Sequence, residues 1–156
     1  MRKFIPTNIY IILQCIILSL LSCTPESCLE ETQSFLKASF YSGEETVKLT
    51  APDSLSLYGL NRDSIIYDNK TGVQPALIPL NASTESSKFI IIINGVTDTV
   101  EFRYSSYPHL ISKECGYTFY HHLDTAPVHT KHLIDTIYLS NETITTLNVE
   151  NIRIFY

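Results

Sequence analysis

Residues 88–104, KFIIIINGVTDTVEFRY, place an Asn-Gly pair between two runs rich in β-branched and aromatic residues. Asn94 and Gly95 suit the two positive φ angles of a two-residue type I′ turn, so the stretch predicts a β-hairpin. A loop of this length also sets the register, with Ile93 opposite Val96. The hairpin is the clearest local structure in the chain.

The predicted hairpin has one apolar face and one mixed face. Alternation along the strands places on the apolar face Phe89, Ile91, Ile93, Val96, Val100, Phe102 and Tyr104. The other face carries Ile90, Ile92, Thr97, Thr99, Glu101 and Arg103. A sheet with this pattern packs against a core on one side. Asp98 is the exception on the apolar face, and we expect its carboxylate to reach water because it lies near the turn.

Short runs of the same composition recur on both sides of this hairpin. Beyond its two strands, Lys88–Ile93 and Val96–Tyr104, the predicted strands are Phe35–Tyr41, Val47–Thr50, Ser54–Tyr58, Ser64–Tyr67, Ala76–Leu80, His109–Ile111, Tyr117–Leu123, Ile134–Leu139 and Asn151–Tyr156. So many short strands predict an all-β fold, an antiparallel β-sandwich that is immunoglobulin-like or related. A partly open β-barrel is the alternative. The last of these strands is expected to close the sheet as an edge strand.

The N-terminus has the pattern of a secretory signal. Arg2 and Lys3 precede a mostly apolar run at 9–21, which is too short to cross a bilayer. The run ends in Leu20-Leu21-Ser22-Cys23, which is similar to the lipobox at which bacterial enzymes acylate a cysteine and cleave before it. An ordinary cleaved signal peptide is the alternative.

This pattern predicts three parts in the chain. Residues 1–22 would be a lipoprotein signal peptide, 23–33 a lipidated tether, and 34–156 a single β-sandwich domain. Two or more acyl chains on Cys23 would hold the protein stably on a membrane. We expect a cell-envelope location, at the outer membrane, facing the periplasm or the surface.

The charge of the chain argues against nucleic acid as a partner. Arg2 and Lys3 account for two of the eleven Lys and Arg, so the chain after Ser22 has nine against sixteen Asp and Glu, a net charge of −7. Nucleic-acid binding needs clustered basic side chains that displace counterions. The partners that we expect are the membrane, through the lipid on Cys23, and an envelope protein or a glycan. We expect no cofactor.

The four cysteines can be assigned by position. Cys15 lies in the segment to be removed and Cys23 takes the lipid, which leaves Cys28 and Cys115. An even pair in an oxidising compartment predicts a disulfide. A catalytic or metal-binding pair is the alternative, although no Cys-x-x-Cys spacing supports it.

Two groups of side chains are candidates for binding. His121, His129 and His132 are close in sequence and imidazole is a common zinc ligand, although His121 and His122 must point to opposite faces of a strand. On that strand, Phe119 and Leu123 are expected to turn inward with His121. An aromatic surface that stacks on a sugar could include Tyr104, Tyr107, Tyr117 and Tyr120. No Gly-x-Ser-x-Gly elbow is present. The acid pairs Glu30-Glu31 and Glu44-Glu45 are expected to be solvated charges in a linker and a turn, and we expect no enzymatic activity.

Several segments together carry a resemblance to a known family. They are Cys23, Cys28, Phe35–Tyr41, Ala76-Leu77-Ile78-Pro79-Leu80, Asp98-Thr99-Val100-Glu101-Phe102, Tyr104, Ser112-Lys113-Glu114-Cys115-Gly116-Tyr117, Phe119 and Glu150-Asn151-Ile152-Arg153-Ile154-Phe155-Tyr156. The chain resembles a family of small Bacteroidota lipoproteins known as a domain of unknown function. The resemblance implies a β-rich envelope lipoprotein and supplies no active site. We expect a non-enzymatic protein-interaction or accessory module; the alternatives are a carbohydrate-binding surface lipoprotein and a fimbria-like subunit.

Overall fold

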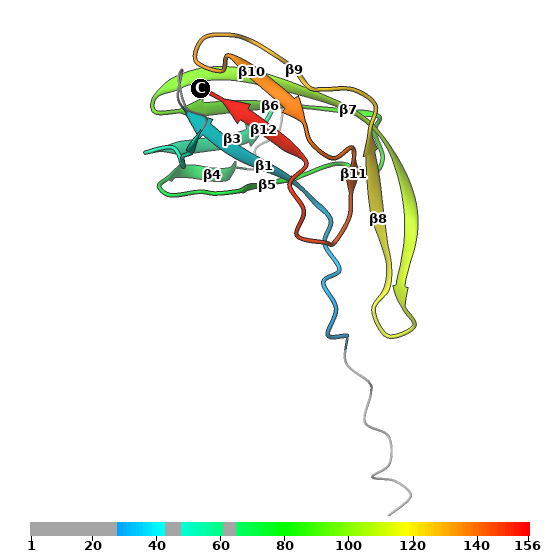
Figure 1. Ribbon diagram of the computed structural model, residues 1–156. Helices are drawn as coiled ribbons and strands as arrows, with labels where there is room; N and C mark the ends of the chain where they lie inside the picture. The colour runs from blue at the N-terminus through cyan, green and yellow to red at the C-terminus, as the bar shows by residue number, and fades with distance from the viewer. Residues whose placement is uncertain (1–27, 43–47, 61–64) are drawn as a thin grey trace, which may run out of the picture.

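The fold is all-β, as the composition predicts. A computed structural model describes residues 28–42, 48–60 and 65–156, and in these it contains strands and no helix (Figure 1). The strands are β1 (Phe35–Ser42), β2 (Lys48–Leu49), β3 (Leu55–Gly59), β4 (Ile65–Lys70), β5 (Ala76–Pro79), β6 (Ser86–Ile93), β7 (Val96–Ser112), β8 (Gly116–Leu123), β9 (Val128–His129), β10 (Thr136–Leu139), β11 (Thr143–Ile144) and β12 (Ile152–Phe155). None of the described segments is a helix long and apolar enough to span a membrane. The segments predicted as signal peptide and lipidation site lie outside the described residues.

The strands form two sheets that face each other. One sheet has the order β10-β12-β1-β2, with β5 also paired to β1, and the other has the order β11-β8-β7-β6-β3-β4, with β9 paired to β7. The second sheet is antiparallel and curls into half of a barrel, so the arrangement is a β-sandwich with one strongly curved layer (Figure 1). The predicted fold class is confirmed.

The predicted hairpin is confirmed in both register and turn. Ile93 pairs with Val96 and Phe89 with Val100. Asn94 has φ 51° and Gly95 φ 85°, the conformation that an Asn-Gly turn supplies at low cost. The apolar face is buried except at Val96, which lies beside the turn and is exposed.

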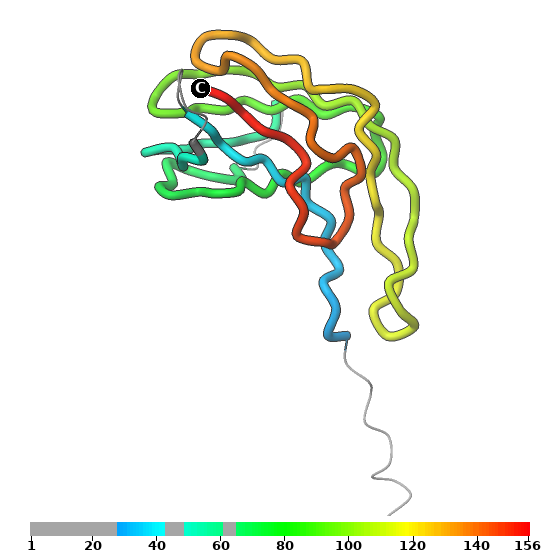
Figure 2. The backbone as a smooth tube through the Cα atoms, viewed as in Figure 1, coloured from blue at the N-terminus to red at the C-terminus, as the bar shows by residue number. Residues whose placement is uncertain are grey.

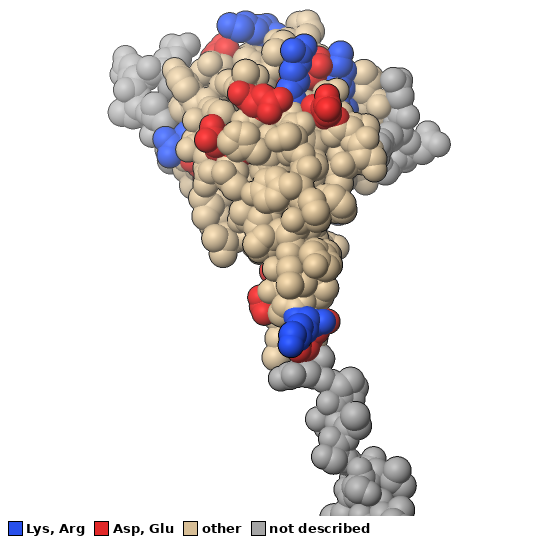
Figure 3. Space-filling view, turned by 90° about the vertical axis from the view of Figure 1, so that its right-hand side faces the viewer, with Lys and Arg blue, Asp and Glu red and all other residues tan. Residues whose placement is uncertain are grey.

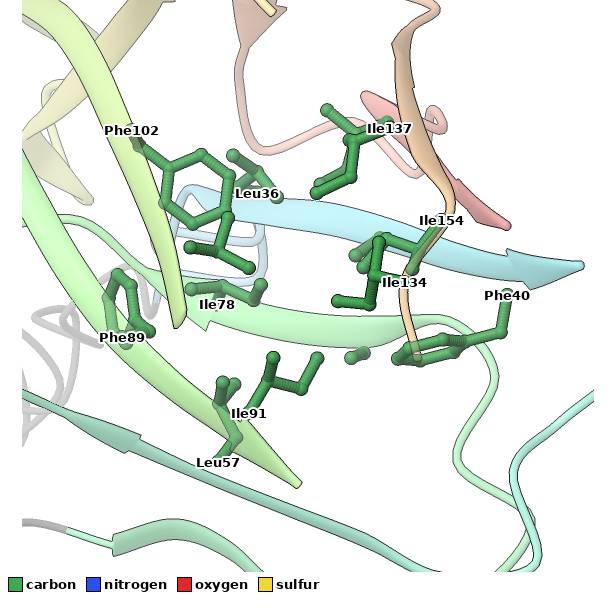
Figure 4. Close-up of a cluster of buried hydrophobic side chains, with 14 of the residues drawn as sticks. Leu36, Phe40, Leu57, Ile78, Phe89, Ile91, Phe102, Ile134, Ile137 and Ile154 are labelled. Carbon is green, nitrogen blue, oxygen red and sulfur yellow. The ribbon is translucent and has the colours of Figure 1, made fainter. Parts of the chain in front are cut away.

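The core lies between the two sheets. Its fully buried side chains include Leu36, Phe40 and Ile154 from the first sheet and Leu57, Ile91 and Phe102 from the second (Figure 4). Ile134, in the segment before β10, is also buried in this cluster. Burial of such side chains stabilises the fold by about 1.5–3 kcal/mol each relative to exposure. The packing of these side chains between the two sheets therefore holds the sheets together.

The structure differs from the predicted strands in two ways. β7 runs without a break through the two strands predicted at Val96–Tyr104 and His109–Ile111, because β8 pairs with it from Tyr104 to Ser112. The C-terminal strand β12 is not an edge strand, contrary to the prediction. It lies between β10 and β1, antiparallel to the first and parallel to the second, so its polar backbone groups have partners on both sides.

The long β7–β8 hairpin leaves the body of the sandwich. We call its outer part, residues 106–120, the arm, and the segment 28–34 before β1 the strap. Figure 2 shows the strap and the arm leaving the same side of the sheets and running in the same direction. This pair of segments carries the candidate site.

Candidate functional site

A disulfide joins the strap to the tip of the arm. Cys28 and Cys115 are bonded and their Cα atoms lie 4.8 Å apart, which confirms the predicted pair. Cys115 belongs to the turn between β7 and β8, where Gly116 has φ 74° and the Ser112 hydroxyl accepts a hydrogen bond from the Cys115 N–H. At the other end of the strap, the Ser34 hydroxyl donates to the Phe119 carbonyl. The strap is thus fastened to the arm at two points.

The arm has two faces that differ in their side chains. Cross-strand partners share a face, so Pro108 and Phe119 lie together, and beyond them Leu110 and Tyr117. Leu110 is 48% exposed, Phe119 46% and Tyr117 73%. We call this face the outer apolar face. Its large apolar side chains are exposed to solvent, although side chains of this kind are more often buried. The prediction that Phe119 turns into the core is wrong, because this part of β8 lies on the arm, outside the sandwich.

The opposite face of the arm carries a group of stacked rings. Tyr107 pairs with Tyr120 across the strands, and their ring centroids are 6.1 Å apart in an edge-to-face arrangement. The His109 ring stacks on Tyr120 with centroids 4.1 Å apart. The Tyr120 hydroxyl lies 3.3 Å from the Thr146 hydroxyl, which links the group to the body of the domain. We call this group the ring cluster.

The arm is uncharged apart from its tip. Residues 104–112 and 115–123 contain no Asp, Glu, Lys or Arg, and the turn between them contributes Lys113 and Glu114. Figure 3 shows charged side chains at the top of the molecule and at the far end of the part formed by the arm and the strap. Between them, that face of the molecule has an uncharged surface. In an acidic protein, such a surface is a candidate contact surface.

The four tyrosines predicted for glycan binding do not form one surface. Tyr107 and Tyr120 belong to the ring cluster, whereas Tyr117 lies on the outer apolar face. Tyr104 is only 1% exposed, so its ring cannot stack on a sugar, and the prediction of Tyr104 as a glycan-binding residue is wrong.

The Tyr104 hydroxyl is occupied by a hydrogen-bond network inside the body. It donates to the Asn81 carbonyl at 3.0 Å, accepts from the Asn81 N–H, and lies 2.7 Å from the Ser87 hydroxyl. Asn81 and Ser87 also line an open groove of about 440 Å³. Their contacts with Tyr104 serve to hold the 81–87 segment onto β7.

The three histidines considered as metal ligands lie apart from one another. His121 is buried at the base of the arm, with Nδ1 2.8 Å from the Ser106 hydroxyl. Burial lowers the pKa of His121, so its ring is neutral at neutral pH. His129 pairs with Val100 in the body, and His132 is held at Thr97 near the β6–β7 turn. Within the described ranges, no three His, Cys, Asp or Glu side chains are placed to hold a metal ion.

Asp98 has a role that the sequence prediction missed. Its side chain is 2% exposed, so the expectation that it reaches water is wrong. The Thr130 hydroxyl donates to Oδ1 at 2.6 Å and the His132 N–H donates to the same atom at 2.9 Å. The backbone N–H groups of Leu133 and Ile134 donate to Oδ2 at 2.9 and 3.0 Å. One carboxylate thus organises the whole 130–134 segment.

The charge on Asp98 is stabilised by these donors. Burial alone would raise the pKa of Asp98, but the hydrogen bonds from Thr130, His132, Ile134 and Leu133 outweigh it and lower the pKa from 3.8 to about 2. The exposed His132 ring donates from Nδ1 to the Thr97 carbonyl at 2.8 Å, and the same atom lies 3.2 Å from Asp98 Oδ1. The charged carboxylate of Asp98 therefore has a structural role, which is to hold the 130–134 segment against β7.

Comparison with known proteins places the domain in a family without giving it an activity. No curated protein and no solved structure matches the chain. Residues 54–156, about two thirds of the chain, match DUF6452, a family of unknown function. The match includes the arm and Cys115, and the strap with Cys28 lies before it. The chain therefore belongs to the DUF6452 family.

Proposed function

We propose that this chain is a lipoprotein of the bacterial cell envelope, acylated at Cys23, that acts as a non-enzymatic interaction module at the outer membrane. The lipobox-like run ending at Cys23 supports the anchor, and the resemblance to Bacteroidota lipoproteins supports the source. The arm and its uncharged surface support an interaction role.

The disulfide between Cys28 and Cys115 is the observation on which the proposal chiefly rests. Cys28 follows the proposed lipid-bearing residue by five positions, and the bond joins it to the tip of the arm. A disulfide is typical of a protein that matures in an oxidising compartment. Because Cys28 lies only five positions after Cys23, the bond would keep the tip of the arm close to the proposed anchor.

The ring cluster is the surface that we assign to a protein partner. Tyrosine gives a large contact area with little loss of side-chain entropy, and aromatic residues are enriched at protein interfaces. Tyr107 is exposed, its ring contacts the edge of Tyr120, and His109 stacks on Tyr120 in turn. A partner protein of the envelope can dock there without any charge complementarity.

Replacing Cys23 with Ser is expected to abolish lipid attachment. Cells expressing the full-length chain are fed an alkyne fatty acid, and incorporation into the purified protein is measured. Cys15→Ser is the matched control, since it changes another cysteine in the same leader and is expected to label like the unmodified protein. Equal labelling of the Cys23→Ser variant would mean that the proposed anchor is wrong.

A photo-crosslinking amino acid at position 107 is expected to capture an envelope protein in intact cells. The matched control carries the same amino acid at position 138, because Tyr138 is 59% exposed and lies on β10, away from the arm. The interaction role is supported if the variant at position 107, and not the one at position 138, gives a discrete band of higher mass on a gel. One partner protein should be identified in that band. Recovery of the monomer alone at both positions would count against that role.

A further inference from the structure

We propose that Leu110 and Tyr117 form a second membrane contact, in which the outer apolar face rests in the interfacial region of the bilayer that holds Cys23. The inference rests on the proposed lipid anchor and goes beyond it, because it assigns a lipid-binding surface to the folded domain. It concerns the face of the arm opposite the ring cluster.

The chain between Cys23 and Cys28 is too short to let the tip of the arm move far from the anchor. Five peptide units separate Cys23 from Cys28, and fully extended they span at most about 18 Å. The Cα atom of Cys115 is 4.8 Å from that of Cys28, and Tyr117 is two residues further on. An acylated Cys23 therefore keeps the tip of the arm within a short distance of the headgroups, whatever path the intervening residues take.

The side chains of the outer apolar face near the tip suit a membrane interface. Leu110 and Tyr117 are cross-strand partners, so their side chains lie side by side on one face. Both are well exposed, and Tyr117 at 73% is the most exposed tyrosine among the described residues. Tyrosine is enriched at membrane interfaces because its ring is apolar and its hydroxyl is polar, and leucine contributes apolar area.

The charges of the arm point to an uncharged type of membrane contact. The arm has no basic cluster, only Lys113 beside Glu114 in the turn, and the chain as a whole is acidic. Attraction to anionic lipid through several Lys or Arg is therefore not the basis of the contact. The outer apolar face is suited to a zwitterionic surface, and the contact should persist at high salt because no charge pairing holds it.

The test uses tryptophan as a reporter, since the chain has none of its own. Tyr117→Trp puts a single tryptophan on the outer apolar face, and Tyr138→Trp puts one on β10 as the matched control. Each chain, starting at Cys23 with the disulfide formed, is coupled through its one free thiol to a maleimide lipid in phosphatidylcholine vesicles. Fluorescence is compared between vesicles with ordinary and with brominated acyl chains.

We expect brominated lipid to reduce the Tyr117→Trp emission at least twofold more than the Tyr138→Trp emission. Adding Leu110→Ser to the Tyr117→Trp chain should lower that quenching, while circular dichroism shows the fold unchanged. Equal quenching of the two reporters, or none at position 117, would overturn the proposal. A protein crosslinked from position 117 in cells, without quenching on vesicles, would assign the face to a protein instead.

The outcome is independent of whether cells acylate Cys23. The lipid is attached chemically here, so a failure of quenching rejects the second contact and leaves the anchor standing. Loss of the anchor proposal would show instead as an absence of fatty-acid label on the full-length chain in cells.

Discussion

Replacing Asp98 with Ala is expected to lower the free energy of unfolding by about 3–4 kcal/mol. The substitution removes the acceptor for the Thr130 hydroxyl and for three backbone N–H groups, those of His132, Leu133 and Ile134. A buried donor without a partner costs about 1–3 kcal/mol, and these donors lie in a segment whose Ile134 is fully buried. The segment cannot turn its N–H groups to water without withdrawing Ile134 from the core.

Equilibrium unfolding in urea measures this effect. Asp135→Ala is the matched control, because Asp135 directly follows the 130–134 segment and has an exposed side chain, and its loss should change stability by less than about 0.5 kcal/mol. Asp98→Asn should also be destabilising, since its amide nitrogen is a donor placed among donors. A loss below about 1 kcal/mol for Asp98→Ala would show that water satisfies the segment instead.

The same carboxylate gives the unmodified protein a dependence on pH. Its pKa is about 2 when folded, against an ordinary value of 3.8, so the folded state binds the proton more weakly than the unfolded chain. The stabilisation is complete above about pH 4 and is lost as pH falls towards 2. As the pH is lowered from about 4 to about 2, the urea concentration at the midpoint of unfolding should fall for the unmodified protein. It should fall less for Asp98→Asn. Parallel curves for the two proteins would contradict the assignment.

Asp98 also shows where sequence reasoning succeeds and where it stops. The alternation in residues 88–104 places it on the apolar face, which is correct, because side-chain direction in a strand is a local property. Its burial depends on residues 130–134, more than 30 positions away, which fold over the strand. A single acid in a row of core residues was nevertheless a signal that donors were needed.

The other differences have the same non-local origin. Residues 105–108 lie outside the predicted strands, yet β7 continues through them because β8 pairs with it along the whole arm. The position of β12 inside its sheet depends on a parallel pairing with β1, at the other end of the described chain. No local pattern predicts which distant strand will pair. The disulfide could be predicted because the proposed signal and lipid leave only two cysteines.

Removing the disulfide is the second change expected to have a large effect. The double variant Cys28→Ser/Cys115→Ser should lose about 2–4 kcal/mol of unfolding free energy. The bond closes a loop with a sequence separation of 87, for which the chain-entropy relation gives between 4 and 5 kcal/mol. We expect less than that figure, because the strap gains freedom in the folded state once the bond is gone.

The strap has few other contacts to hold it. Apart from the bond, the Ser34 hydroxyl on the Phe119 carbonyl is the hydrogen bond that joins residues 28–34 to the arm. Part of the entropy released on cutting the bond therefore returns to the folded protein, which reduces the loss of stability. The core strands β3 and β6 do not contact the bond, so the local effect should be confined to the strap and the arm.

Urea unfolding and hydrogen exchange together test this account. Amides of the turn at 113–116 should lose protection in the double variant, whereas those of β6 should fall only by the global loss of stability. Reduction of the unmodified protein with dithiothreitol should reproduce the double variant and controls for the serine substitutions. A loss of the full 4–5 kcal/mol with uniform exchange would mean that the strap stays ordered without the bond. In that case contacts of the strap itself, and not the disulfide, would hold the arm beside the anchor.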